Sequence, residues 1–195
     1  MKKLNIALMA LALTLSISCK DTAKDGENMD ETMTDMDDSQ TMNDDMEMKE
    51  ITVPMASKSG SSVTGSISFT QKEGSVEMVA NLKGLEEGTH AIHLHENGDC
   101  SADDATSAGG HWNPNSKEHG DWEDGMNHMG DIGNLEADSY GNATITFSTD
   151  KWCIDCDDDA KNIVGKGVIV HAKADDFTSQ PSGAAGQREA CGVIQ

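Results

Sequence analysis

Hydrophobic and polar residues alternate in short runs over most of the chain beyond residue 50. The alternation is clearest in SISFT and ATITF. A period of two is typical of a half-buried strand, so one set of side chains should face the core: Ile67, Phe69, Ile145 and Phe147.

Similar runs predict strands at residues 51–57, 62–70, 76–82, 89–95, 142–149 and 162–171, most of them separated by glycine-containing turns. No segment shows a sustained helical period. We therefore expect an all-β domain, an antiparallel sandwich or barrel.

Two long irregular stretches interrupt the predicted strands, one from Glu96 to Gly133 and one from Ala172 to Cys191. Long loops without structure of their own are usually functional or disordered. The first stretch holds three of the seven histidines, so we expect it to be functional.

The N-terminus has the pattern of an export signal. Two lysines precede an apolar run from Leu4 to Ile17, which is too short to span a bilayer, and Ser18-Cys19 follows at once. This pattern predicts a signal peptide over residues 1–19, with lipidation of Cys19 that would tether the protein to a membrane of the periplasm or cell envelope. Ser16 stands where such sites usually carry Leu, and the alternative is an ordinary signal peptide with an unmodified cysteine.

Residues 20–49 alternate methionine with acidic and small polar residues and have no aromatic residue. Such a segment buries too little apolar surface to fold, so we expect an acidic, disordered tether before a domain at residues 50–195. Thioethers also suit Cu(I), which leaves copper collection as the alternative role of six methionines: Met29, Met33, Met36, Met42, Met46 and Met48.

The formal net charge of the chain is −21, and residues 51–195 hold 23 acidic against 9 basic side chains. Nucleic acid is therefore not expected as a partner, because phosphate binding needs basic patches. An exported chain meets an oxidising compartment, so disulfides are expected.

The histidines have spacings that are typical of metal sites. His93 and His95 lie two apart on one predicted strand and share a face, whereas His90 points to the other face. His111 and His119 lie eight apart in a glycine-rich stretch. Imidazole suits copper and zinc, and a carboxylate among histidines suits zinc. The remaining members of the cluster are His128, Asp131 and His171.

Residues 50–195 resemble the copper/zinc superoxide dismutases. The resemblance is carried by HLH, GDC, SAGGHWNP, the eight-residue step to His119, H-x-G-D, the GN that follows, VIVHAKADD and GxREACGVI. It implies an eight-stranded antiparallel Greek-key barrel or sandwich, immunoglobulin-like, with two long functional loops. The implied activity is dismutation of superoxide to dioxygen and hydrogen peroxide, with one copper ion cycling between Cu(II) and Cu(I) and one zinc ion per subunit. Members of the family include monomers and homodimers.

The resemblance also assigns the site residues. It places copper on His93, His95, His111 and His171, and zinc on His111, His119, His128 and Asp131. His111 would bridge the two ions and act with Arg188 in catalysis. Asp175 would link copper and zinc histidines from outside the ligand set, and Cys100 would form a disulfide with Cys191. His90 is the one spare histidine, for which we expect a hydrogen-bonded structural role.

Arg188 is expected to attract the anionic substrate; the alternative is a surface ion pair with Glu189. Steering of superoxide by a local positive field is a known property of this family. Here the two metal ions and Lys173 are the other candidate positive charges, whereas the first loop carries acidic residues, so the sequence predicts weak steering. Those residues are Asp121, Glu123 and Asp124.

WCIDCDDD is not part of the resemblance. Cys153 and Cys156 are predicted to form a local disulfide or to remain two thiols. The alternative is an auxiliary metal or redox site that would also use Asp155 and Asp157–Asp159.

Two other function classes compete with the dismutase. A non-catalytic copper- and zinc-binding protein needs neither an arginine beside copper nor a bridging imidazole. A zinc hydrolase needs an open zinc position and a general base.

Overall fold

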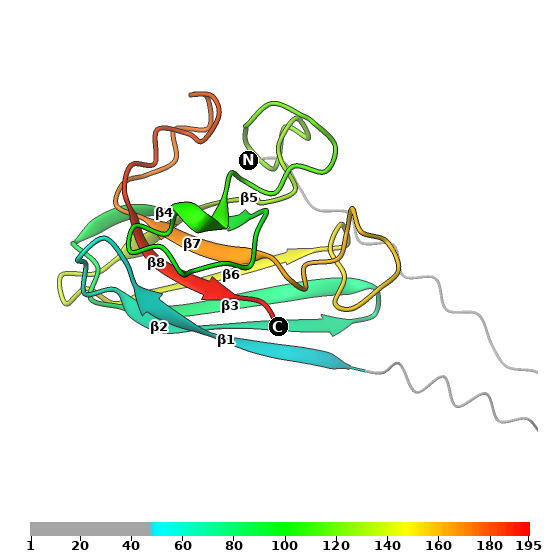
Figure 1. Cartoon of the computed structure of the whole chain (residues 1–195), viewed down its shortest axis with the longest axis horizontal. Helices are drawn as coiled ribbons and strands as arrows, with labels where there is room; N and C mark the ends of the chain where they lie inside the picture. The colour runs from blue at the N-terminus through cyan, green and yellow to red at the C-terminus, as the bar shows by residue number, and fades with distance from the viewer. Residues whose placement is uncertain (1–47) are drawn as a thin grey trace, which may run out of the picture. The chain divides into compact units, whose positions relative to one another are not determined.

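The computed structural model describes residues 48–195, and these form a closed antiparallel barrel (Figure 1). The predicted signal peptide, Cys19 and nearly all of the predicted tether lie outside the described residues. The eight strands are β1 (Lys49–Ser57), β2 (Thr64–Lys72), β3 (Ser75–Lys83), β4 (Gly88–His95), β5 (Asp131–Ala137), β6 (Ala143–Thr149), β7 (Gly167–His171) and β8 (Arg188–Val193).

The order of strands around the barrel is β1-β2-β3-β6-β5-β4-β7-β8, and β1 pairs with β8 to close it. Because β3 lies beside β6 and β4 beside β7, the connections cross between non-consecutive strands, as in a Greek key. The predicted eight-stranded antiparallel fold is confirmed. The only helical element among the described residues is a 3₁₀ turn at Thr106–Ala108.

The predicted inward-facing side chains lie in or against the core. Ile67 and Phe69 of β2 are fully buried, and Ile145 and Phe147 of β6 are partly buried and pack against the same cluster. The alternation of hydrophobic and polar residues therefore identified the correct face of both strands.

The boundaries of several predicted elements were wrong. Strands β5 and β8 lie partly inside the stretches that we expected to be loops, which therefore end at residues 130 and 187. Residues 162–166 are not part of β7, because the chain turns at Gly165 with a φ of 83°. The first strand begins at Lys49, one residue before the predicted domain boundary.

Strand pairing is irregular at two histidines. In the pairing of β4 with β5, the register shifts between Ile92 and His93, and His93 lies opposite Asp131. In the pairing of β7 with β8, the register shifts just before His171, which lies opposite Arg188. Bulges re-aim side chains and are common beside functional sites. Both irregularities place candidate site residues opposite one another.

The two long loops project from the same side of the barrel (Figure 1). The amide of Gln180 in the second loop donates to the backbone oxygen of His119 at 2.8 Å, and the backbone N–H of His119 donates to Gln180 at 2.9 Å. The loops are therefore joined to each other where the candidate metal ligands lie.

Candidate metal centre

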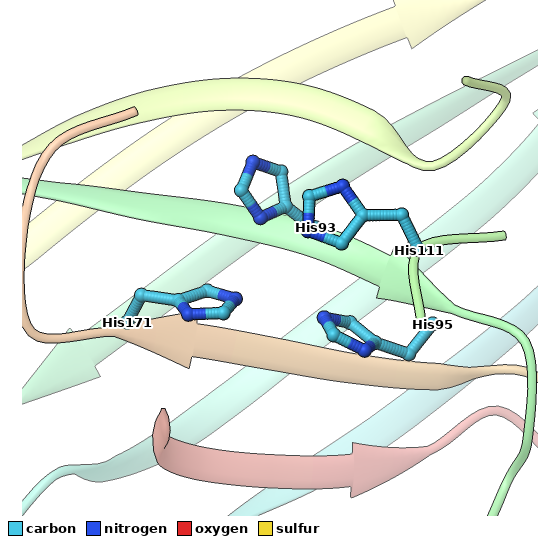
Figure 2. A group of neighbouring side chains, drawn as sticks. All are labelled: His93, His95, His111 and His171. Carbon is cyan, nitrogen blue, oxygen red and sulfur yellow. The ribbon is translucent and has the colours of Figure 1, made fainter. Parts of the chain in front are cut away.

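Four buried histidines form the first candidate ligand group. His93 and His95 alternate along β4 with Ile92 and Leu94, which belong to the core, so these two histidines face outward beneath the loops. Figure 2 shows them beside His171, at the end of β7, and His111, on the first loop. Each of the four histidines offers one nitrogen, and these nitrogens lie within 4.8 Å of one another.

The second candidate group gathers around Asp131. Its two carboxylate oxygens lie 2.8 Å from Nδ1 of His111, 3.0 Å from Nδ1 of His119 and 3.2 Å from Nδ1 of His128. The backbone N–H of His128 also donates to Asp131 at 2.8 Å, which fixes the carboxylate. One carboxylate and three imidazoles make a donor set that suits zinc.

His111 belongs to both groups. Its Nδ1 faces Asp131, and its Nε2 is buried without a hydrogen-bond partner on the side of the other histidines. A single imidazole ring therefore joins the two groups, through a different nitrogen on each side.

Buried histidine nitrogens without a hydrogen-bond partner indicate whether this site fits metal ions. A buried polar atom without a hydrogen bond costs free energy, and most such atoms in folded proteins have partners. Six of the eight buried side-chain atoms without a partner among the described residues are histidine nitrogens of these two groups, so the site fits two bound cations. They are His93 Nδ1, His95 Nε2, His111 Nε2, His119 Nδ1, His128 Nδ1 and His171 Nε2.

Asp175 connects the groups from behind. One carboxylate oxygen accepts from Nε2 of His93 at 2.7 Å and the other accepts from Nε2 of His119 at 2.8 Å. Gly183 packs so closely on this carboxylate that a Cβ would overlap it, and its φ of +65° also favours glycine. Such outer partners orient metal-binding imidazoles.

Burial and neighbouring charges set the protonation of these groups. Burial lowers the pKa of His111 to about 4, although Asp131 opposes the shift. Burial also tends to lower the pKa of His119, but Asp131 and Asp175 outweigh it and raise this pKa to about 9. Burial tends to raise the pKa of Asp131, yet contacts with three histidines hold it well below its usual range. His111 is therefore neutral and Asp131 ionised at neutral pH, as metal binding requires, whereas His119 carries a proton that a bound cation would displace.

A pocket of about 330 Å³ opens onto the four-histidine group. His95, His111 and His171 line it, and Arg188 is the only Lys or Arg side chain of the described residues that does so. Lys173, the other candidate cationic side chain, is not part of the lining. Burial lowers the pKa of Arg188, and Asp104 opposes the shift. An arginine remains charged at neutral pH, so the pocket offers a cation to a small anion.

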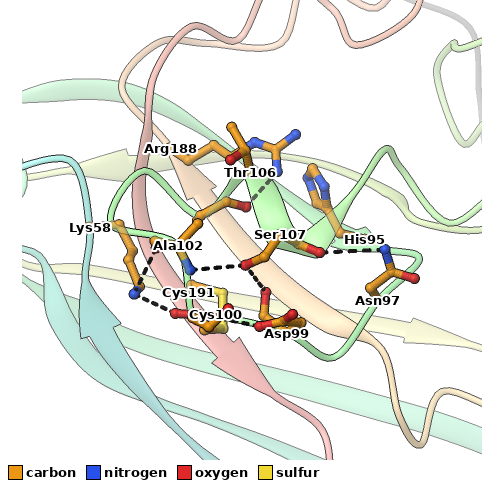
Figure 3. The surroundings of a disulfide bond; sticks show 12 residues. Lys58, His95, Asn97, Asp99, Cys100, Ala102, Thr106, Ser107, Arg188 and Cys191 are labelled. Atoms are coloured by element: carbon orange, nitrogen blue, oxygen red, sulfur yellow. Dashed lines mark hydrogen bonds between the residues drawn. A yellow bond between two sulfur atoms is a disulfide. The ribbon is translucent and has the colours of Figure 1, made fainter.

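The guanidinium of Arg188 is held by the first loop. Nη1 donates to the backbone oxygen of Ala105 and Nη2 to that of Gly109, each at 2.7 Å. A disulfide between Cys100 and Cys191 joins the same loop to β8 (Figure 3). The expected pairing of these cysteines is therefore present in the structure. The carbonyl of Gly109 is a contact that the sequence did not reveal, because a backbone oxygen carries no residue-type signal.

Cys153 and Cys156 form the second disulfide. A local disulfide was one of the outcomes that the sequence left open. The alternative metal site needs free thiolates, and no ligand group forms there among the described residues.

His90 lies outside both ligand groups. It is buried, and its ring nitrogens each lie 2.9 Å from a backbone oxygen, that of His171 and that of Glu86. This arrangement fits the expected structural role.

A search of residues 48–195 for a helix long and apolar enough to cross a membrane finds none.

Comparison with known proteins places this arrangement in a family. The profile described as copper/zinc superoxide dismutase (SODC) matches residues 63–194. The chain is 38% identical over 140 residues to an extracellular superoxide dismutase [Cu-Zn] of Drosophila melanogaster, which covers 68% of this chain and 75% of the relative. It is also 38% identical over 143 residues to a superoxide dismutase [Cu-Zn] of Schizosaccharomyces pombe, covering 69% and 90% of the two chains.

A solved structure shows the same relationship. The crystal structure of the clock protein EA4 matches with a TM-score of 0.66 and 34% identity, over 74% of this chain and 92% of that one. The chain therefore belongs to the copper/zinc superoxide dismutase family.

Proposed function

We propose that this protein dismutes superoxide at the pocket beside Arg188, where two superoxide ions and two protons give dioxygen and hydrogen peroxide. The observation that carries the proposal is the position of His111, whose two nitrogens belong to two different ligand groups. The four-histidine group would hold copper: His93, His95, His111 and His171. The group around the aspartate would hold zinc: His111, His119, His128 and Asp131.

Copper, when bound, supplies the change of valence that accepts and returns an electron, whereas zinc has one valence and contributes charge and geometry. His95 is ready for this role, because its Nδ1 donates to the oxygen of Gly109 and its Nε2 remains free. Asp175 would keep His93 and His119 in the orientations that their ligand nitrogens require.

Arg188 would bind the substrate anion. Two of its N–H donors are used by backbone oxygens of the first loop, which fixes the plane of the guanidinium and leaves its other donors for superoxide. His111 would hold a proton at Nε2 when this nitrogen is not bound to copper and would release it to the reduced product, since His111 lines the pocket and its Nε2 has no other hydrogen-bond partner.

Two observations separate this proposal from the other function classes. A protein that only stores metal has no need to fix an arginine on the wall of the copper pocket. A zinc hydrolase needs an open coordination position, whereas four protein ligands surround the candidate zinc site.

The test is the decay of superoxide in the presence of the full-length protein loaded with copper and zinc. We expect fast decay that is abolished when copper is omitted and persists in part when zinc is omitted. Stoichiometric binding of both ions without accelerated decay would favour the non-catalytic metal-binding protein.

We also propose that the protein is exported and tethered by lipid at Cys19, in the periplasm or cell envelope. The relative from Drosophila melanogaster is named as extracellular, and residues 1–19 have the pattern of a lipoprotein signal. Mass spectrometry of the mature N-terminus should show a lipidated Cys19; a free thiol there would exclude the tether. A homodimer is the assembly to test by light scattering.

A further inference from the structure

The disulfide between Cys153 and Cys156 closes a compact segment that the proposed reaction does not use. This segment, residues 150–163, is called the cystine loop below. The backbone N–H of Cys153 donates to the oxygen of Lys161 at 2.9 Å, and the N–H of Ile163 donates to the oxygen of Cys153 at 3.0 Å. These bonds and the disulfide fix the position of the intervening residues.

The cystine loop is anchored on the barrel. The backbone N–H of Ile154 donates to the side chain of Gln71 on β2 at 2.6 Å. The ammonium of Lys49 on β1 donates to the backbone oxygens of Ile154 and Asp155 at 3.1 and 2.9 Å. One side of the cystine loop is thus bound to two strands.

The other side of the cystine loop contacts residues 111–130, which carry three of the candidate zinc ligands and are called the zinc-ligand loop below. The indole N–H of Trp152 donates to the backbone oxygen of Met129 at 2.9 Å, and Trp152 is 1% exposed. Met129 directly follows His128 and lies two residues before Asp131. The hydrogen bond from Trp152 therefore holds the chain at a point between these two candidate zinc ligands.

Aromatic contacts add a second point of attachment. Trp122 lies between His119 and His128 in sequence, and its ring packs edge-on against Trp152, with centroids 6.0 Å apart. Phe147 of β6 packs against Trp122 at 4.9 Å, and the ammonium of Lys151 lies 4.7 Å from the centroid of the Trp122 ring. The cystine loop therefore holds the zinc-ligand loop both before and after His128.

We propose that Trp152 is a positioning residue for the zinc centre, and that the cystine loop slows zinc release by holding the zinc-ligand loop closed. The inference rests on the proposed zinc ligands. An ion held by ligands on a surface loop leaves when that loop opens locally, and contacts that oppose opening lower the population of the open state. Loss of a buried hydrogen bond that leaves its acceptor unpaired should speed release by roughly 5- to 100-fold.

The test is zinc release from the fully loaded, full-length protein into an excess of a colorimetric chelator. W152F keeps an aromatic ring and removes the donor to Met129; we expect zinc release at least about 5-fold faster than from the parent protein. W122L removes the second attachment from a partly exposed position, so it should fold and also release zinc faster. C153S/C156S should accelerate release as well, because it frees the loop that carries Trp152.

F69L is the matched control. Phe69 packs against Trp152 from the core side with centroids 6.3 Å apart, and no aromatic contact joins it to Trp122. The F69L variant should have a lower melting temperature. Its rate of zinc release should stay within about 2-fold of the parent, since the contacts of Trp152 with Met129 and Trp122 are retained. Cobalt(II) in the zinc site gives a spectroscopic readout, whose visible bands should shift in W152F and not in F69L.

The outcomes separate this inference from the proposed function. If the parent protein retains zinc and W152F and W122L release it at the parent rate, or F69L releases it as fast as they do, the positioning role is wrong. A parent protein that binds no zinc would contradict the proposed ligand set itself. Faster release from both tryptophan variants with an unchanged F69L supports the inference.

Discussion

Arg188 and His95 donate to the same backbone oxygen, that of Gly109. Nη2 of Arg188 lies 2.7 Å from this oxygen and Nδ1 of His95 lies 2.9 Å from it. A carbonyl oxygen only accepts, so Nδ1 of His95 carries a proton and Nε2 is left free to bind a metal ion. One carbonyl thus fixes both a candidate copper ligand and the arginine that lines the pocket.

Replacing Arg188 tests its proposed role in binding the substrate. R188A removes the only lysine or arginine from the described lining of the pocket, so kcat/KM for superoxide should fall roughly 10- to 100-fold. Inhibition by a small anion such as azide should weaken in parallel. R188K keeps the charge but loses the paired donors, and it should fall between the parent and R188A. Both quantities are measured from steady-state superoxide decay with the parent, R188A and R188K. Equal kcat/KM and equal inhibition for R188A and the parent would exclude the substrate role of Arg188.

The sequence placed two candidate ligands on the correct face of a strand, but it missed two strands that carry other candidate site residues. A period of two put His93 and His95 on one face, and this holds because β4 is regular between them. Strands β5 and β8 were not predicted, because candidate site residues occupy positions where an ordinary strand has hydrophobic ones. Asp131 begins β5, and Arg188 and Cys191 lie in β8.

Contacts between distant segments could not be predicted from the sequence for another reason. Trp152 and Met129 are 23 residues apart and meet only because the barrel brings their loops together. Nothing in the local pattern of either segment encodes that contact. The resemblance to known dismutases did not cover WCIDCDDD either, so it placed no residue of this loop beside the metal centre.

The disulfide between Cys100 and Cys191 should contribute strongly to stability. It links residues 91 positions apart, and the chain-entropy estimate for a loop of that length is about 4–5 kcal/mol. C100S/C191S should lower the free energy of unfolding by roughly 3–5 kcal/mol in a denaturant titration. The bond also holds the loop that presents the oxygens of Ala105 and Gly109 to Arg188, so kcat/KM should fall too.

C153S/C156S is the control for this effect. Its cysteines are only 3 positions apart, for which the same estimate gives about 2 kcal/mol. If the two double variants lost equal stability, loop closure would not be the main contribution of the longer bond.

Glu189 should make stability depend on pH. Burial raises the pKa of its carboxyl, Glu86 adds to the shift, and His90 at 3.8 Å opposes it. Oxygen Oε2 of Glu189 is buried without a hydrogen-bond partner. Because the folded-state pKa lies above the unfolded value, the folded protein binds the proton more tightly, and stability falls as pH rises from about 4.5 through the raised pKa.

E189Q removes this ionisation. It should raise the melting temperature at pH 7 and leave it unchanged near pH 4, where the carboxyl of the parent is already protonated. The exposed Glu87 provides the control, since E87Q should change neither value. A gain in E189Q that is equal at both pH values would show that charge burial is not the cause.

The dependence of the rate on salt should reveal two opposing fields. Residues 51–195 carry 9 basic against 23 acidic side chains and should repel superoxide at long range, whereas Arg188, which lines the pocket, should attract it there. Salt screens both fields, over about 30 Å at 0.01 M and 8 Å at 0.15 M. The two changes oppose each other, so kcat/KM should vary by less than about 3-fold between these ionic strengths.

R188A separates the two fields, because it removes the arginine's share of the attraction and leaves the long-range repulsion intact. Its kcat/KM should rise as an inert salt is added, while that of the parent stays nearly level. A steep fall in the parent protein would mean that attraction dominates at long range, and that the acidic residues of the first loop lie too far from the path of the substrate to weaken its steering.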